Sequence, residues 1–138
     1  MLVRDLFQYY RVTAGKVRLN VDIHNMCVSL NTAIPVGLII NELVTNTLKY
    51  AFPNGRPGEI TISAEKGPEG ITLMFRDNGV GIPDSVNWLE PRSLGLRLIH
   101  TLVDQMSGTI SLDKSAGTTF TIRIPDTCNH SNESPRKE

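Results

Sequence analysis

Stretches in which apolar and polar residues alternate come in adjacent pairs along this chain, and this pairing constrains its fold most. A half-buried strand turns successive side chains to opposite faces, so alternation over about 4–8 residues predicts a strand. The segments expected to form strands are 17–23, 27–30, 59–64, 71–77, 109–113 and 118–124. Strands that come in pairs between helical segments predict an α+β two-layer sandwich, with a mixed, mostly antiparallel sheet, rather than a doubly wound parallel sheet.

Three segments have the helical period, and we expect about three helices on one face of the sheet. They span residues 2–13, 33–51 and 94–106. Asn31 or Thr32 is the expected cap of the second helix, and Gly108 is the expected stop of the third. The chain then forms one domain over residues 1–125, with residues 1–14 as an N-terminal helix and residues 126–138 as a polar, frayed tail.

Composition and charge exclude two classes of function. The 138 residues include 14 basic and 14 acidic side chains, so the formal net charge is zero and no general affinity for nucleic acid is expected. No apolar run approaches the roughly 20 residues of a membrane helix. Cys27 and Cys128 lack metal-ligand spacing, so we expect two free thiols and a cytoplasmic location.

The helical segment 33–51 carries polar residues where an apolar helix would not need them. At about 100° per residue, Glu42, Asn46 and Lys49 fall within about 60° of one another. An amide oxygen can ligate Mg²⁺, a carboxylate one turn away can orient or deprotonate a water or hydroxyl, and a lysine can meet phosphate. A solvated helix face explains the same short pattern equally well.

The segment DNGVGIP, residues 77–83, follows a predicted strand. Asp77 therefore lies at the end of the strand, and Gly79 and Gly81 allow close backbone approach. A carboxylate there can accept a hydrogen bond from an exocyclic amine such as that of adenine. The alternative is a plain turn, because Asp-Asn-Gly is a strong turn former.

Glycines also precede two later elements. Gly95 lies at the entry to the third helix, where backbone N–H groups and the helix dipole favour phosphate, although the other glycines and the lysine of a P-loop are missing. Gly117 and Thr118 precede the last strand, where the hydroxyl can contact a ligand or cap a turn. Each feature alone also fits simple packing.

The order and spacing of these four motifs resemble the ATP-binding catalytic domain of sensor histidine kinases. That domain belongs to the superfamily of DNA gyrase, Hsp90-type chaperones and MutL-type ATPases. The resemblance covers about residues 30–125, and NELVTNTLKYAFPNG is similar to the motif NELVTNALKHAF of one histidine kinase subfamily. It implies the Bergerat-type ATP-binding sandwich, which agrees with the paired strands.

The resemblance also implies roles for individual residues. Asn46 corresponds to the asparagine that ligates the Mg²⁺ bridging the ATP phosphates, and Glu42 to the acidic residue of the superfamily. Lys49 corresponds to a phosphate contact and Tyr50 to a ribose or base contact. Asp77 corresponds to the aspartate that reads the adenine amine. The other implied nucleotide contacts are Gly79, Gly81, Gly95, Leu96 and Thr118.

Several features depart from the family pattern. Ser93 stands where the second glycine-rich box normally has its first glycine, and the lid of residues 82–92 is short and lacks a clear Phe-rich box. Arg92 in the lid can meet the γ-phosphate or can simply be exposed to solvent, and Asn41 has no assigned role. None of the histidines, His24, His100 and His130, lies in the long helical hairpin that normally bears the phosphoacceptor.

We therefore expect a catalytic domain that uses ATP and Mg²⁺ to phosphorylate a histidine on a dimerisation domain outside this chain. A response regulator would act downstream, and the fragment itself would be monomeric. Two alternatives remain open at this point: a serine kinase of the anti-sigma-factor type, and a module that binds ATP without turning it over.

Overall fold

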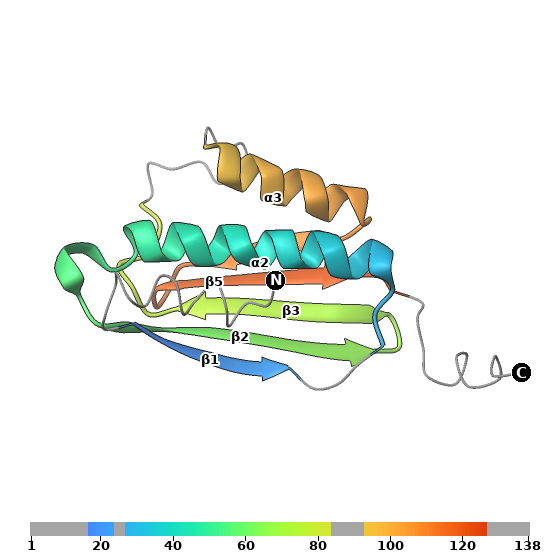
Figure 1. Ribbon diagram of the computed structural model, residues 1–138, viewed down its shortest axis with the longest axis horizontal. Helices are drawn as coiled ribbons and strands as arrows, with labels where there is room; N and C mark the ends of the chain where they lie inside the picture. The colour runs from blue at the N-terminus through green and yellow to red at the C-terminus, as the bar shows by residue number, and fades with distance from the viewer. Residues whose placement is uncertain (1–16, 24–26, 84–92, 127–138) are drawn as a thin grey trace, which may run out of the picture.

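A single β-sheet carries helices on one face in the computed structural model (Figure 1), which describes residues 17–23, 27–83 and 93–126. The elements in chain order are β1 (Val17–Ile23), α2 (Leu30–Tyr50), a 3₁₀ turn (Pro53–Gly55), β2 (Gly58–Gly67), β3 (Gly70–Asp77), α3 (Leu94–Gln105), β4 (Thr109–Asp113) and β5 (Thr118–Ile124). No helix of the described residues combines the length and apolar character needed to cross a bilayer.

The five strands are ordered β1-β2-β3-β5-β4. β1 pairs with β2 in parallel, and the other neighbouring strands are antiparallel. The predicted mixed, mostly antiparallel sheet is therefore confirmed. The β3–β5 register places Asp77 opposite Thr118, so two residues of the predicted site meet at one end of the sheet.

The core lies between the sheet and the helices α2 and α3, which run side by side over it (Figure 1). Alternation puts the apolar side chains of β2, β3 and β5 into this layer, among them Ile60, Ile62, Phe75 and Ile122. The two-layer sandwich is confirmed. Two of the expected three α-helices are described, and the third, over residues 2–13, lies outside the described residues.

Helix α2 is longer at its start than the sequence predicts. It begins at Leu30 after the N-cap Ser29, so the predicted strand at 27–30 and the caps Asn31 and Thr32 are wrong. A short apolar run does not distinguish a strand from the first turn of a helix. Near its middle the helix buries Ile39, and it ends before Pro53, as predicted.

Helix α3 agrees with the prediction to within one residue. The Ser93 side chain caps its N-terminus by accepting a hydrogen bond from the Leu96 amide at 3.3 Å. At the other end, Ser107 adopts the left-handed conformation (φ 59°) in place of the expected Gly108. Gly108 is needed for a close approach instead, because a Cβ there would lie 2.6 Å from the carbonyl oxygen of Arg123.

A polar cluster joins α2 and β5 at the end of the sheet that carries the β2–β3 hairpin. The Asp126 carboxylate accepts from the Ser29 amide at 3.3 Å and lies 3.9 Å from Lys66 Nζ, which donates to the Cys27 carbonyl at 2.6 Å. Asp126 therefore contacts the domain, although the sequence places it in the tail.

Cys27 is disulfide-bonded, so the free thiol expected there is wrong. That expectation followed from the missing metal-ligand spacing, which carries no information on which sulfurs the fold brings together. Cys128 lies outside the described residues.

Candidate functional site

Asp77 ends β3 with its side chain buried at the end of α2, only 3% exposed. One carboxylate oxygen, Oδ1, accepts a hydrogen bond from the Gly79 amide at 2.8 Å. The other, Oδ2, accepts from the Thr47 hydroxyl at 3.5 Å. A loop and a helix thus hold one carboxylate between them, in a place where an unpaired charge would be costly.

The pKa of the Asp77 carboxyl group is raised above its usual value. Burial is the largest cause, because it penalises the charged form. The Gly79 amide, the Thr47 hydroxyl and the positive charge of Arg56 act in the opposite direction, in that order. The group is a buried acceptor whose ionisation depends on its few donors.

The glycine-containing loop after Asp77 packs against the end of α2 and is hydrogen-bonded to it. The Val80 amide donates to the Ala51 carbonyl at 2.9 Å, and a Cβ on Gly79 would collide with the same oxygen. Gly117, with φ 79°, lies against the Asp77 carbonyl in the same way. Gly81, with φ 84°, lies where its Cβ would be 3.3 Å from the Gly117 carbonyl. Glycine is thus required where two loops and a helix end meet.

Glu42 and Asn46 on α2 meet the N-terminus of α3. A Cβ on Gly95 would lie 2.8 Å from Glu42 Oε1 and 3.2 Å from Asn46 Nδ2. Both polar side chains are half-buried, and they are one turn apart on the side of α2 that faces α3. The chain therefore brings a carboxylate, an amide and a helix N-terminus together, and this group of atoms suits anion and cation binding at one place.

The remaining predicted residues are distributed around this centre. Thr118 is buried beside Asp77 in the sheet register. Lys49 and Tyr50 are exposed at the end of α2, with Tyr50 70% exposed. Leu96 is half-buried and packs on the hydrophobic core, so its side chain is at least partly structural.

Other predicted features fall elsewhere. Asn41 is half-buried on α2, His100 is half-buried in α3, and Arg92 lies outside the described residues together with most of the lid.

Sequence reasoning missed two residues that support Asp77. Thr47 donates to it, and Arg56 acts on it through its charge and donates to the Asn78 carbonyl at 3.3 Å. Gly117, which the sequence singled out together with Thr118, allows the close approach. A signal for Thr47 was present, because the similar motif NELVTNALKHAF has alanine at that position. Nothing in the sequence linked Arg56 to Asp77.

The side chains at this site fit a magnesium ion held mainly by a nucleotide. Mg²⁺ prefers oxygen ligands, keeps several waters and is commonly bound through one or two protein groups plus phosphates. Asn46 and Glu42 place an amide and a carboxylate oxygen against Gly95 at the start of α3. Within the described ranges, no three His, Cys, Asp or Glu side chains form a metal-binding cluster.

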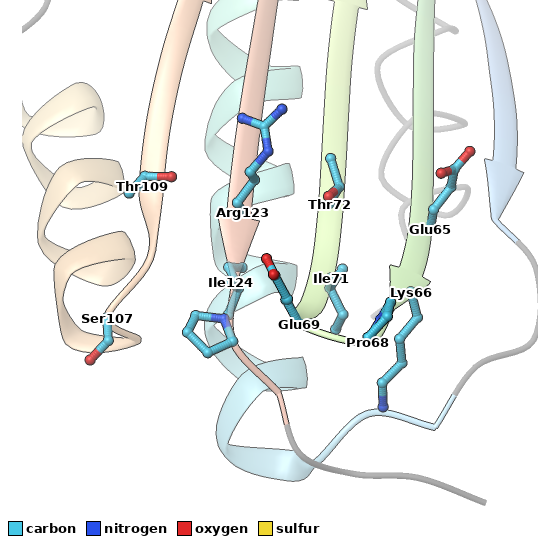
Figure 2. A pocket seen from close by; sticks show the side chains of 13 residues that line it. Glu65, Lys66, Pro68, Glu69, Ile71, Thr72, Ser107, Thr109, Arg123 and Ile124 are labelled. Atoms are coloured by element: carbon cyan, nitrogen blue, oxygen red, sulfur yellow. The ribbon is translucent and has the colours of Figure 1, made fainter.

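A separate pocket of about 430 Å³ lies at the other end of β3 (Figure 2). Glu65, Thr72 and Arg123 line it from neighbouring strands, and the β2–β3 hairpin and Ser107 close it. Because β3 runs the length of the sheet from this hairpin to Asp77, the pocket contains no residue of the predicted site.

Comparison with known proteins shows the family to which the chain is related. Residues 31–127 match the model of the family described as histidine kinase-, DNA gyrase B-, and HSP90-like ATPase. Blue-light-activated histidine kinase 2 of Erythrobacter litoralis (strain HTCC2594) is 29% identical over 113 residues, covering 80% of this chain and 33% of the relative. Sensor histidine kinase PdtaS of Mycobacterium tuberculosis (strain CDC 1551 / Oshkosh) is 32% identical over 92 residues, covering 64% of this chain and 18% of the relative.

Solved structures show the same relationship. The E. litoralis EL346 blue-light activated histidine kinase superposes with a TM-score of 0.76 at 25% identity, over 89% of this chain and 43% of that one. Its histidine kinase domain gives a TM-score of 0.79 at 24% identity, over 89% and 58%. The chain spans a third or less of the length of the two curated relatives named above. It belongs to the family of histidine kinase-, DNA gyrase B- and HSP90-like ATPases, as an ATP-binding catalytic domain of the histidine kinase type.

Proposed function

We propose that this domain binds ATP with Mg²⁺ and transfers the γ-phosphoryl group to a histidine carried by a dimerisation domain. The observation that carries the proposal is the convergence of Glu42 and Asn46 on the N-terminus of α3 at Gly95. Asp77 and Thr118 lie side by side at the same end of the sheet. The first group would contact the phosphates of the nucleotide, and the second group would contact its base.

Asp77 would select the base. Its carboxylate accepts hydrogen bonds, so it favours adenine, which presents an amine where guanine presents a carbonyl. Gly79, Gly81 and Thr118 would border the base, where the two glycines let the loop pack closely against Ala51 and Gly117. Tyr50, exposed at the end of α2, would cover the base or the ribose.

Asn46 would hold Mg²⁺, which, when bound, offsets the charge of the ATP phosphates. Lys49 would add a further positive charge, and Gly95 and Leu96 at the start of α3 would bring backbone N–H groups to the phosphates. Glu42 would orient the incoming histidine. The imidazole nitrogen forms a bond to the γ-phosphorus as the bond to the β-phosphate oxygen breaks, and ADP leaves. Catalysis of this kind is mainly positioning and charge neutralisation.

The partners follow from this chemistry. The phosphohistidine would pass its phosphoryl group to a response regulator. The domain would work in the cytoplasm, where ATP is abundant, and as a monomer when separated from the dimerisation domain. The related kinases named above are about three to six times as long as the matched segment, so such partner domains have room within proteins of this kind.

A transfer assay tests the proposal. The domain is incubated with γ-labelled ATP, Mg²⁺ and a histidine-bearing dimerisation domain, and label on the latter is tested for stability in acid and base. Acid-labile, base-stable label supports histidine phosphorylation. Acid-stable label would favour the serine kinase instead, and nucleotide binding without transfer would favour a passive ATP-binding module.

Asn46→Ala and Asp77→Asn extend this test to the site. Asn46→Ala should weaken Mg²⁺-dependent ATP binding at least about tenfold, because it removes a metal ligand. Asp77→Asn should weaken ATP binding by about 10- to 100-fold, as expected for a charge-assisted hydrogen bond. Asn41→Ala is the matched control, since the same residue type five positions earlier lies outside the proposed site. Calorimetric affinities that do not change in the first two variants would overturn the assigned roles.

A further inference from the structure

Thr47 is the one side chain that donates to the Asp77 carboxylate among the described residues. It follows Asn46 on α2, is 8% exposed, and its hydroxyl lies 3.5 Å from Asp77 Oδ2. The Gly79 amide occupies Oδ1 at 2.8 Å. A carboxylate has about four lone-pair sites, so two donors leave capacity for a ligand amine.

Two donors from different elements restrain the carboxylate more than one does. The terminal torsion of an aspartate is broad, so a single hydrogen bond to Oδ1 leaves the plane of the group free to turn. The Thr47 hydroxyl restrains the second oxygen from α2. Because Thr47 is on the helix that carries Asn46, it also connects the orientation of the base-reading group to the helix that holds the phosphate-side residues.

We propose that Thr47 is a positioning residue, which keeps the Asp77 carboxylate ionised and aimed at the exocyclic amine of the base. The proposal rests on the adenine-reading role of Asp77 proposed above. It adds a residue that the similar family motif does not supply, because that motif has alanine where this chain has Thr47.

The charges around Asp77 support this role. Burial raises the pKa of the carboxyl group, and the Thr47 hydroxyl is one of three groups that lower it, with the Gly79 amide and Arg56. Arg56 supplies the charge that reaches Asp77 from the loop after α2. The residues opposite Asp77, Ile60 on β2 and Thr118 on β5, carry no charge. Loss of the hydroxyl should therefore raise the pKa further and reduce the ionised fraction near neutral pH.

The experiment compares Thr47→Val, which keeps the shape and removes the hydroxyl, with Thr47→Ser, which keeps the hydroxyl. Thr45→Val is the matched control on the same helix, outside the Asp77 contact. The Asp77 carboxyl carbon is titrated by NMR without nucleotide. The midpoint should rise in Thr47→Val, stay near the wild-type value in Thr47→Ser and not change in Thr45→Val. Thermal melting checks that each variant is folded, and Thr47→Ala replaces Thr47→Val if the latter does not fold.

Binding of Mg²⁺·ADP by calorimetry gives the second readout. At a pH near the Asp77 titration midpoint of the Thr47→Val variant, this variant should bind Mg²⁺·ADP about tenfold more weakly than wild type, as expected for one hydrogen bond to a charged group. The difference in affinity between the two proteins should narrow as the pH rises. Thr47→Ser should keep most of the wild-type affinity. Equal Asp77 midpoints in wild type and Thr47→Val would overturn the positioning role whatever the nucleotide result. If wild type binds no adenine nucleotide, the proposed function fails, whereas a midpoint shift would still support the Thr47–Asp77 pairing.

Discussion

Burial of the Asp77 carboxyl group has opposite consequences for binding and for folding. Binding an amine requires the ionised form, whereas burial raises the pKa of the group above its unfolded value. A group with a raised pKa in the folded state stabilises the fold in acid, and this contribution is lost as the pH rises through the folded pKa. At neutral pH the ionised Asp77 therefore reduces the stability of the protein without nucleotide.

Asp77→Asn should thus raise the free energy of unfolding at neutral pH while it weakens ATP binding. The amide can still accept from the Gly79 amide and donate to the Thr47 hydroxyl, so no buried polar group loses its partner. Urea unfolding across pH measures the effect. The advantage of the variant should be largest above the folded pKa and disappear below the ordinary aspartate range. A variant less stable than wild type at every pH would contradict this expectation.

At the scale of residues, the sequence identified the polar groups but not their supports. Asn46 and Asp77 were predicted because their residue types and their positions in motifs point to chemistry. Thr47 and Arg56 were missed because ordinary threonines and arginines have no motif of their own. Their importance comes from a distance to Asp77 that only the packing of α2 on the sheet determines.

At the scale of elements, the start of α3 illustrates how a departure from a family pattern is accommodated. Ser93 replaces a glycine of the family box, and its side chain caps the helix through the Leu96 amide. A serine at this position therefore stabilises the helix whose N-terminus faces Glu42 and Asn46.

Ser93→Ala should lower the free energy of unfolding by about 1 kcal/mol, whereas Ser93→Gly should cost only a few tenths, about 0.3 kcal/mol. Ser93→Gly is the comparison, because glycine is nearly as good an N-cap as serine without the side-chain hydrogen bond. Chemical denaturation measures both variants. The capping role is wrong if Ser93→Ala costs no more than Ser93→Gly.

The elements themselves were predictable where their patterns are long. The strands at 71–77 and 118–124 largely alternate, and the structure has β5 at the predicted residues and β3 one residue longer. The start of α2 was wrong because the residues CVSL are few and mostly apolar, and such a run fits two kinds of element. In the structure the backbone of the N-cap residue Ser29 is extended, at φ −67° and ψ 153°, and the helix begins directly after it.

At the scale of the whole molecule, the end of the sheet remote from the candidate site is stabilised by contacts of one carboxylate, that of Asp126. The Asp126 side chain is 2% exposed and joins the end of β5 to Ser29, before α2, and to Lys66 on β2. Elements from three parts of the chain meet there.

Asp126→Ala should lower the free energy of unfolding by about 1–3 kcal/mol, because it leaves the half-buried Ser29 amide and the Lys66 ammonium with fewer partners. ATP binding should change little, since the residues proposed to bind the nucleotide lie at the opposite end of β3. Glu69→Ala, in the exposed hairpin nearby, is the matched control and should have almost no effect. Thermal unfolding and calorimetric binding measure the two properties, and a loss of ATP affinity larger than the loss of stability would contradict the separation of the two ends.

The sequence by itself determined the two-layer class and the types of the longer elements, and it indicated the residues proposed to bind a nucleotide, because periodicity and side-chain chemistry are local properties. Only the tertiary structure decided that Asp77 lies opposite Thr118, that Gly95 lies against Glu42 and Asn46, and that Thr47 donates to Asp77. These pairs are separated by tens of residues along the chain. Their contacts depend on strand order and helix packing, which result from burying all the apolar faces at once.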